Sequence, residues 1–167
     1  MVIKIKHYKL QTFIITLFAL IAITMCSGCK KSNTVDLTTK SIATTIKQDI
    51  VFKDELQNID DKNILQKIYP DMNFDYITDF TVFTSSSGAT AEEIAVFKLK
   101  NNAYIPSVKQ SIENHINDQI TNFENYVPEE IYKIKNSVMN INNNIILYVA
   151  CDTPMDVETL LEKLYNK

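Results

Sequence analysis

The chain has 167 residues and a formal net charge of −3, with 17 lysines, 20 acidic residues, no arginine and no tryptophan. Without arginine it has no bidentate clamp for phosphate or carboxylate groups, and its two glycines are too few for a glycine-rich phosphate loop. The acidic balance also argues against nucleic acid as a partner.

The first 28 residues have the features of a secretory signal. Three lysines precede an apolar run at residues 10–25, and the small residues Ser27 and Gly28 directly precede Cys29. This order of charged, apolar and small-residue regions is typical of a leader that is removed on export. An uncleaved membrane anchor is the alternative, but the apolar run has 16 residues, fewer than the roughly 20 needed to cross a bilayer.

The end of this signal resembles a bacterial lipobox, in which a cysteine that follows small residues receives a diacylglycerol. Cys26 stands where the lipobox usually has an aliphatic residue, and it is itself a poor acceptor because the bulky Met25 precedes it. Two acyl chains hold a protein durably to a membrane. We therefore expect lipidation at Cys29 and a location at the cell membrane, on its extracytoplasmic face.

The predicted organisation is a signal peptide at residues 1–28, a polar tether at 29–36 and a single domain at 37–167. The processed chain would have 139 residues, with 14 lysines against 20 acidic residues and so a net charge of −6. That length suits one domain. Cys151 would be the one unmodified cysteine, so we expect no intramolecular disulfide and a small buried hydrophobic side chain at this position.

Two helices are predicted before the first strand. The first begins near Asp36, where an imperfect apolar stripe follows at helical spacing. The second begins at a cap formed by Asp60 or Asp61 and ends at Pro70.

A hairpin and a long helix follow. Alternating aromatic and β-branched residues predict a strand at about 76–83, and residues 93–100 predict its antiparallel partner. The Ser85-Ser86-Ser87-Gly88 segment between them is interpreted as a flexible hairpin tip. Next comes an amphipathic stripe with spacings of three and four, which predicts the longest helix. The stripe consists of Ile105, Val108, Ile112, Ile116, Ile120 and Phe123.

The last third of the chain predicts a short helix opened by Pro128, a second hairpin and a closing helix. The hairpin strands are expected at 137–141 and 144–151, with a turn at Asn142-Asn143, because asparagine tolerates a positive φ. Four strands in two hairpins predict an α+β domain. Its sheet would be four-stranded and antiparallel, packed by helices on one face.

Three segments resemble a known family. They are Thr90-Ala91-Glu92-Glu93-Ile94-Ala95-Val96-Phe97-Lys98, the Tyr126-Val127-Pro128-Glu129-Glu130 turn that follows Phe123, and the strand that ends at Cys151-Asp152. After a lipobox, they are similar to a family of small lipoproteins of low-GC Gram-positive bacteria, the domain of unknown function numbered four-three-five-eight. The resemblance covers about residues 59–164. It differs at Asn142-Asn143-Asn144, where a glycine is expected, and it implies no catalytic or ligand residues.

Candidate site residues are few. His115 is the only histidine outside the leader, with Asp118 and Gln119 one turn further on. A metal site usually needs three or four ligands, so a helix flank is the better interpretation. Glu92 and Glu93 are adjacent on a strand and point to opposite faces, so they do not flank one glycosidic bond. We predict no catalytic residue, no metal site and no cofactor.

Two functions remain in competition. The first is a non-catalytic domain, tethered to the membrane through Cys29, that binds an envelope protein or a cell-wall component. The alternative is a small cell-wall-directed hydrolase that uses a carboxylate, for which Glu93 and Asp152 are the best candidates. A purely structural role at the envelope is not separable from the first by sequence.

Overall fold

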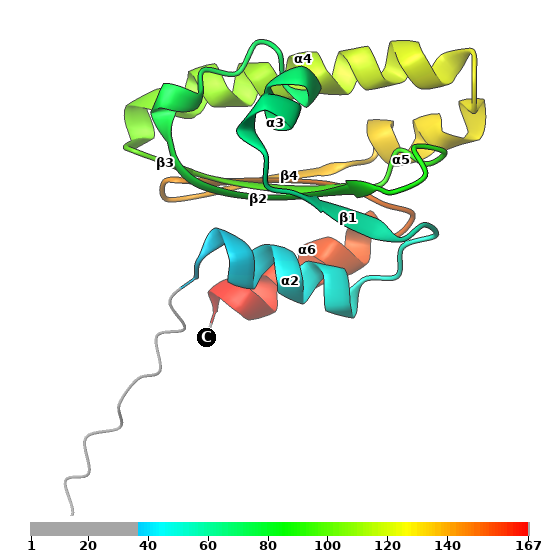
Figure 1. Cartoon of the computed structure of the whole chain (residues 1–167). Helices are drawn as coiled ribbons and strands as arrows, with labels where there is room; N and C mark the ends of the chain where they lie inside the picture. Colours follow the sequence, from blue (N-terminus) through cyan, green and yellow to red (C-terminus); the bar gives the residue numbers. More distant parts are fainter. Residues whose placement is uncertain (1–36, 167) are drawn as a thin grey trace, which may run out of the picture. The chain divides into compact units, whose positions relative to one another are not determined.

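The computed structural model describes residues 37–166, and the predicted leader, the tether and Cys29 lie outside this range. Helix α2 (Thr39–Asp49) comes first, with Thr38 and Ser41 forming a capping box at its start. The elements that follow along the chain (Figure 1) are β1 (Leu56–Ile59), α3 (Lys62–Ile68), η1 (Phe74–Tyr76), β2 (Ile77–Ser85), β3 (Glu93–Leu99), η2 (Asn102–Tyr104), α4 (Ile105–Glu124), η3 (Pro128–Glu130), α5 (Ile131–Lys135), β4 (Val138–Asn142), β5 (Ile145–Ala150) and α6 (Pro154–Tyr165).

The strands form one antiparallel sheet in the order β1-β2-β3-β5-β4. Both predicted hairpins are present, β2 with β3 and β4 with β5, and β3 pairs with β5 to join them. The α+β class is thus confirmed, but the prediction of four strands is wrong, because β1 adds a fifth strand beside β2. The buried residues of β1, Leu56 and Ile59, are three positions apart. They therefore lack the two-residue alternation by which a half-buried strand is recognised.

Helices cover both faces of the sheet, so the prediction of helices on one face is also wrong. Helices α3 and α4 lie on one face, and α2 and α6 lie on the other (Figure 1). Each face of the sheet has its own hydrophobic core: the first core lies between the sheet and the layer of α3 and α4, and the second lies between the sheet and the layer of α2 and α6. In β3, Phe97 and Leu99 face the first core, whereas Ile94 and Val96 face the second core. A strand that is apolar on both sides needs a layer of helices on each side to exclude water from it.

Local sequence signals set several of the connections. Asp61 caps α3 by accepting a hydrogen bond from the backbone N–H of Asn63 at 2.7 Å. Asn143 has φ 53° in the turn between β4 and β5, which suits asparagine, one of the few residues that visit this region routinely. Between residues 37 and 166, no helix combines the length and the apolar character needed to cross a membrane.

Candidate functional site

Two adjacent carboxylates at the start of β3 belong to different polar clusters. Glu92 and Glu93 are each only 1% exposed. Glu93 faces the layer of α3 and α4, where it contacts His115. Glu92 instead contacts the loop before β1 and Lys133 of α5. The two side chains thus point apart, as strand geometry predicts.

Glu93 receives hydrogen bonds from two helical segments. The Tyr69 hydroxyl, directly after α3, donates to Oε1 of Glu93. From α4, His115 Nε2 lies 2.9 Å from Oε2, and Gln119 Nε2 donates to the same oxygen at 3.3 Å. We refer to Tyr69, Glu93, His115 and Gln119 as the Glu93 cluster. It connects β3, α3 and α4 through one buried carboxylate.

The backbone fixes which nitrogen of His115 keeps its proton. His115 Nδ1 lies 3.0 Å from the carbonyl oxygen of Ile68, and a carbonyl only accepts, so Nδ1 carries hydrogen. Burial lowers the pKa of His115, but the charge of Glu93 and the hydrogen bonds to Glu93 and Ile68 outweigh it and raise this pKa above its usual value. Burial, with the charge of Glu93, raises the pKa of Tyr69 well above its usual value. Tyr69 is therefore a neutral donor, and the titrating cation is His115.

A hollow of about 240 Å³ opens beside the Glu93 cluster. Its walls include Glu93 and Gln119 from the cluster, apolar Ile68 and Phe123, and residues of the loop between β2 and β3. The charged residues in its lining are Glu92 and Glu93. The arrangement thus brings a buried carboxylate, an amide and an aromatic ring to one small concavity.

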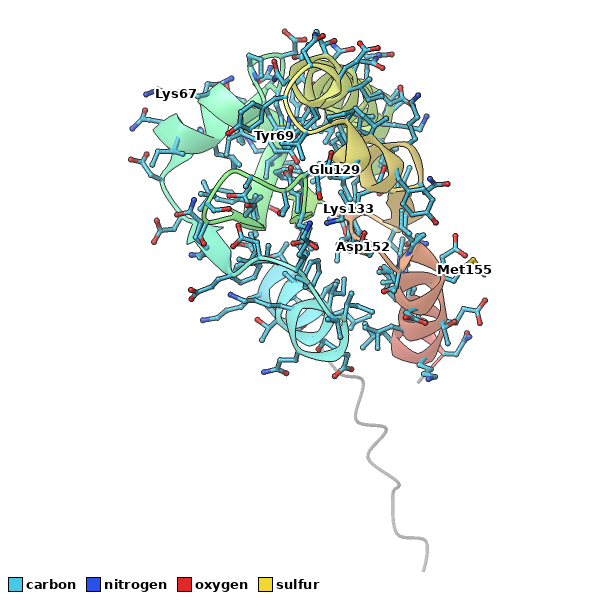
Figure 2. All side chains as sticks on the ribbon, turned by 90° about the vertical axis from the view of Figure 1, so that its right-hand side faces the viewer. Lys67, Tyr69, Glu129, Lys133, Asp152 and Met155 are labelled. Carbon is cyan, nitrogen blue, oxygen red and sulfur yellow. The ribbon has the colours of Figure 1, made fainter. Side chains whose placement is uncertain are left out.

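The second cluster surrounds the buried ammonium of Lys133. Its Nζ lies 3.1 Å from Glu92, 3.0 Å from Glu130 and 3.4 Å from Asp152. Figure 2 shows Lys133 beside Asp152, with Tyr69 in the separate layer of α3 and α4. Burial lowers the pKa of Lys133, but hydrogen bonds to Glu130 and Glu92 and their charges raise it overall. We refer to Glu92, Glu130, Lys133 and Asp152 as the Lys133 cluster, in which the lysine stays charged.

A known family matches more than half of the chain. The family described as "Domain of unknown function (DUF4358)" matches residues 48–151. The chain belongs to the DUF4358 family. No curated protein and no solved structure matched the chain. The matched segment of the DUF4358 domain contains all five strands, the whole Glu93 cluster and every member of the Lys133 cluster except Asp152.

The DUF4358 domain brings together some of the predicted candidates. Gln119 joins His115 at Glu93, whereas Asp118 is exposed on α4. Glu93 pairs with Ala150 in the sheet, which brings Asp152 to the same end, although its side chain contacts Lys133. Between residues 37 and 166, no group of three or more potential ligands is arranged to hold a metal ion.

Cys151 of the DUF4358 domain is buried in the second core, where we expected a small hydrophobic side chain. Burial raises the pKa of its thiol, which disfavours the reactive thiolate. Cys29 lies outside the described residues, so its lipidation stays a prediction.

Sequence reasoning missed both clusters, although signals for them exist. His115 lies three residues after Ile112 and seven after Val108, on the buried stripe of α4. Glu93 belongs to the odd-numbered positions of β3 that face the first core. A polar residue at a buried position of α4 and another at a buried position of β3 could therefore have predicted that the two side chains form a buried pair.

The loop between β2 and β3 is held by Asp54, where we had expected a flexible tip. The Asp54 carboxylate accepts hydrogen bonds from the hydroxyls of Ser85 and Ser87 and from the Ser87 backbone N–H. These bonds lower the pKa of Asp54 to about 2. Gly88, with φ +69°, completes the loop. One wall of the hollow is therefore braced by a surface carboxylate.

Proposed function

We propose that this DUF4358 protein is a lipid-anchored, non-catalytic binding domain on the outer face of the cell membrane. In this proposal Cys29 carries the lipid, and a ligand or partner at the envelope occupies the hollow beside Glu93. The motif around Cys29 supports the anchor, and the hollow supports the binding role.

The observation that carries the proposal is the position of the hollow relative to the start of the domain. Thr39, the first residue of α2, donates a hydrogen bond to Asp79 at 2.6 Å, near the beginning of β2. The hollow lies at the other end of β2, at Thr84 and Ser85. At about 3.3 Å per residue, that separation is roughly 20 Å. The hollow thus lies at the end of β2 opposite to the start of the domain, on the part of the chain that the structure describes.

The arrangement of Glu92 and Glu93 does not suit a glycosidase. Both oxygens of Glu93 already accept internal hydrogen bonds. Glu92 accepts from the backbone N–H groups of Lys53 and Asp54, each at 2.8 Å, and from Lys133. Catalytic carboxylates of a glycosidase must reach both sides of one scissile bond, and these two point apart. The hydrolase remains the alternative proposal, and wild-type turnover of purified cell wall would favour it.

The anchor is tested by mass spectrometry of the N-terminal peptide from purified membranes. We expect a diacylglyceryl-modified Cys29 as the first residue, and we expect Cys29→Ala to leave the membrane fraction. A bare or unprocessed N-terminus would contradict the anchor.

The binding role is tested by photo-crosslinking in cells. A crosslinker at Ala89, an exposed residue between two residues that line the hollow, should capture a defined product. The matched control is the exposed Lys100, just beyond the opposite end of β3. Equal products from both positions, or none from Ala89, would refute a binding surface at the hollow.

A further inference from the structure

We infer that the hollow binds the ammonium group of a small ligand at Glu93, in exchange for the proton carried by His115. This inference rests on the proposed binding function and names the chemistry of its ligand.

The lining of the hollow favours a cationic ligand over an anionic one. Its charged residues are the acids Glu92 and Glu93, and no lysine contributes to its lining. An anion would find no cationic side chain in this lining with which to pair. Ile68 and Phe123 offer apolar contact for a short carbon chain beside the carboxylate. A volume of about 240 Å³ is below the range of drug-sized pockets, so it suits a few heavy atoms or the end of a larger molecule.

Glu92 and Glu93 differ in whether their cationic partners can lose their charge near neutral pH. Glu92 is paired with Lys133, a cation at all physiological pH values that it shares with Glu130 and Asp152, and it accepts hydrogen bonds from two backbone N–H groups. The cation paired with Glu93 is His115, and histidine is the side chain that changes charge near neutrality. Of these two acids, Glu93 is therefore the one whose cationic partner can lose its charge near neutral pH and be replaced by another cation.

Both ring nitrogens of neutral His115 can still form hydrogen bonds within the structure. When Nε2 releases its proton to solvent, Nδ1 still donates to the carbonyl of Ile68. Gln119 Nε2 lies 3.2 Å from His115 Nε2 and can then donate to it. Glu93 keeps its bond from Tyr69 but loses its cationic partner, and a buried unpaired charge is strongly unfavourable. A ligand ammonium that enters from the hollow restores the charge balance, with one proton released for each ammonium bound.

His115 is the group that titrates in this exchange. The groups that face it are Glu93 from β3, Tyr69 after α3, Tyr148 of β5 with ring centroids 6.1 Å apart, and Asp118 on its own helix. Burial raises the pKa of both tyrosines, so they stay neutral. Asp118 adds a negative charge that also favours protonated His115.

The test is an NMR titration of the full chain, kept in nonionic detergent, with butylammonium at pH 6 and pH 8. An alkylammonium keeps its charge across this range, as lysine does. We expect shifts at Glu93, Gln119 and Phe123, and an affinity that rises by up to about tenfold per pH unit until His115 is neutral. Butanol, with the same carbon chain and no charge, should not produce them. Equal affinity at both pH values, or equal shifts with butanol, would overturn the inference.

Variants separate the role of the Glu93 carboxylate from that of the His115 proton. Glu93→Gln should abolish butylammonium binding while its NMR spectrum remains that of a folded protein. His115→Gln should bind with no pH dependence, and Asp118→Asn should keep the wild-type dependence. If butylammonium fails to bind while a crosslinker at Ala89 still captures a product, the ligand chemistry is wrong and the binding function stands. If the crosslinker fails as well, both are wrong.

Discussion

Glu93 and His115 form an ion pair of 2.9 Å between β3 and α4, with side chains only 2% and 6% exposed. Glu93 lines the hollow, and its pairing with His115 connects the sheet to the helical layer above it. The protonation of this pair therefore affects both stability and the binding site.

Stability should depend on pH through His115. Its pKa is raised in the folded state, so its contribution is fully present below the unfolded value of about 6.5. That contribution is lost as pH rises through the folded pKa. The wild type should lose at most about 1.4 kcal/mol of unfolding free energy per pH unit in this window, relative to His115→Gln. Urea denaturation from pH 6 to pH 8.5 measures the difference, and parallel curves for the two proteins would exclude the effect.

Removal of the Glu93 carboxylate should reverse the direction of the pKa shift of His115. Burial, the largest influence on the pKa of His115, lowers it and would persist in Glu93→Gln, whereas the charge that raises it would be gone. We expect the pKa of His115 to move from above to below about 6.5. NMR titration of the His115 ring signals measures this pKa directly. Asp118→Asn is the control, because the charge of Asp118 is the smallest of the influences that raise this pKa; the substitution should lower the pKa of His115 far less. A value unchanged in Glu93→Gln would contradict the ion pair.

The bracing of the loop between β2 and β3 is tested at Asp54. Asp54→Asn replaces one carboxylate oxygen with a group that does not accept hydrogen bonds from Ser85 and Ser87. Backbone amides at Ser87 and Gly88, which donate to Asp54 and to Ser85, should exchange with deuterium faster. The neighbouring exposed Glu55→Gln serves as the control. In the wild type the same loosening should occur in acid, as pH falls from about 3.8 through the lowered pKa of about 2. Unchanged exchange in Asp54→Asn would show that the loop is held by other contacts.

Sequence periodicity was sufficient for elements whose buried face repeats regularly. The stripe from Ile105 to Phe123 predicted α4, and the alternation in β2 and β3 predicted their hairpin. β1 was missed because a four-residue edge strand with buried ends has no repeat and depends on its pairing with β2. The helices on both faces were implied by the apolar residues on both sides of β3, but the sequence does not say which helix covers which face. The Glu93 cluster requires α4 to lie over β3, a relationship between residues 22 positions apart. No local pattern encodes it.

The Lys133 cluster gives the sharpest test of a structural role. Lys133 is buried on α5 between Glu92 and Glu130, whose side chains are at most 3% exposed. Lys133→Met would keep the apolar stem but remove the ammonium that pairs with Glu92 and Glu130, and leave Glu130 only the exposed Lys53 at 3.8 Å. Breaking a buried pair in this way costs about 3–5 kcal/mol. Lys135→Met changes an exposed lysine of the same short helix and should alter stability by less than about 0.5 kcal/mol. Urea denaturation of the two variants compares them directly. Similar losses in both would mean that helix composition matters more than the buried charge. If Glu92→Gln added to Lys133→Met restored part of the lost stability, the uncompensated carboxylate would be identified as the cause.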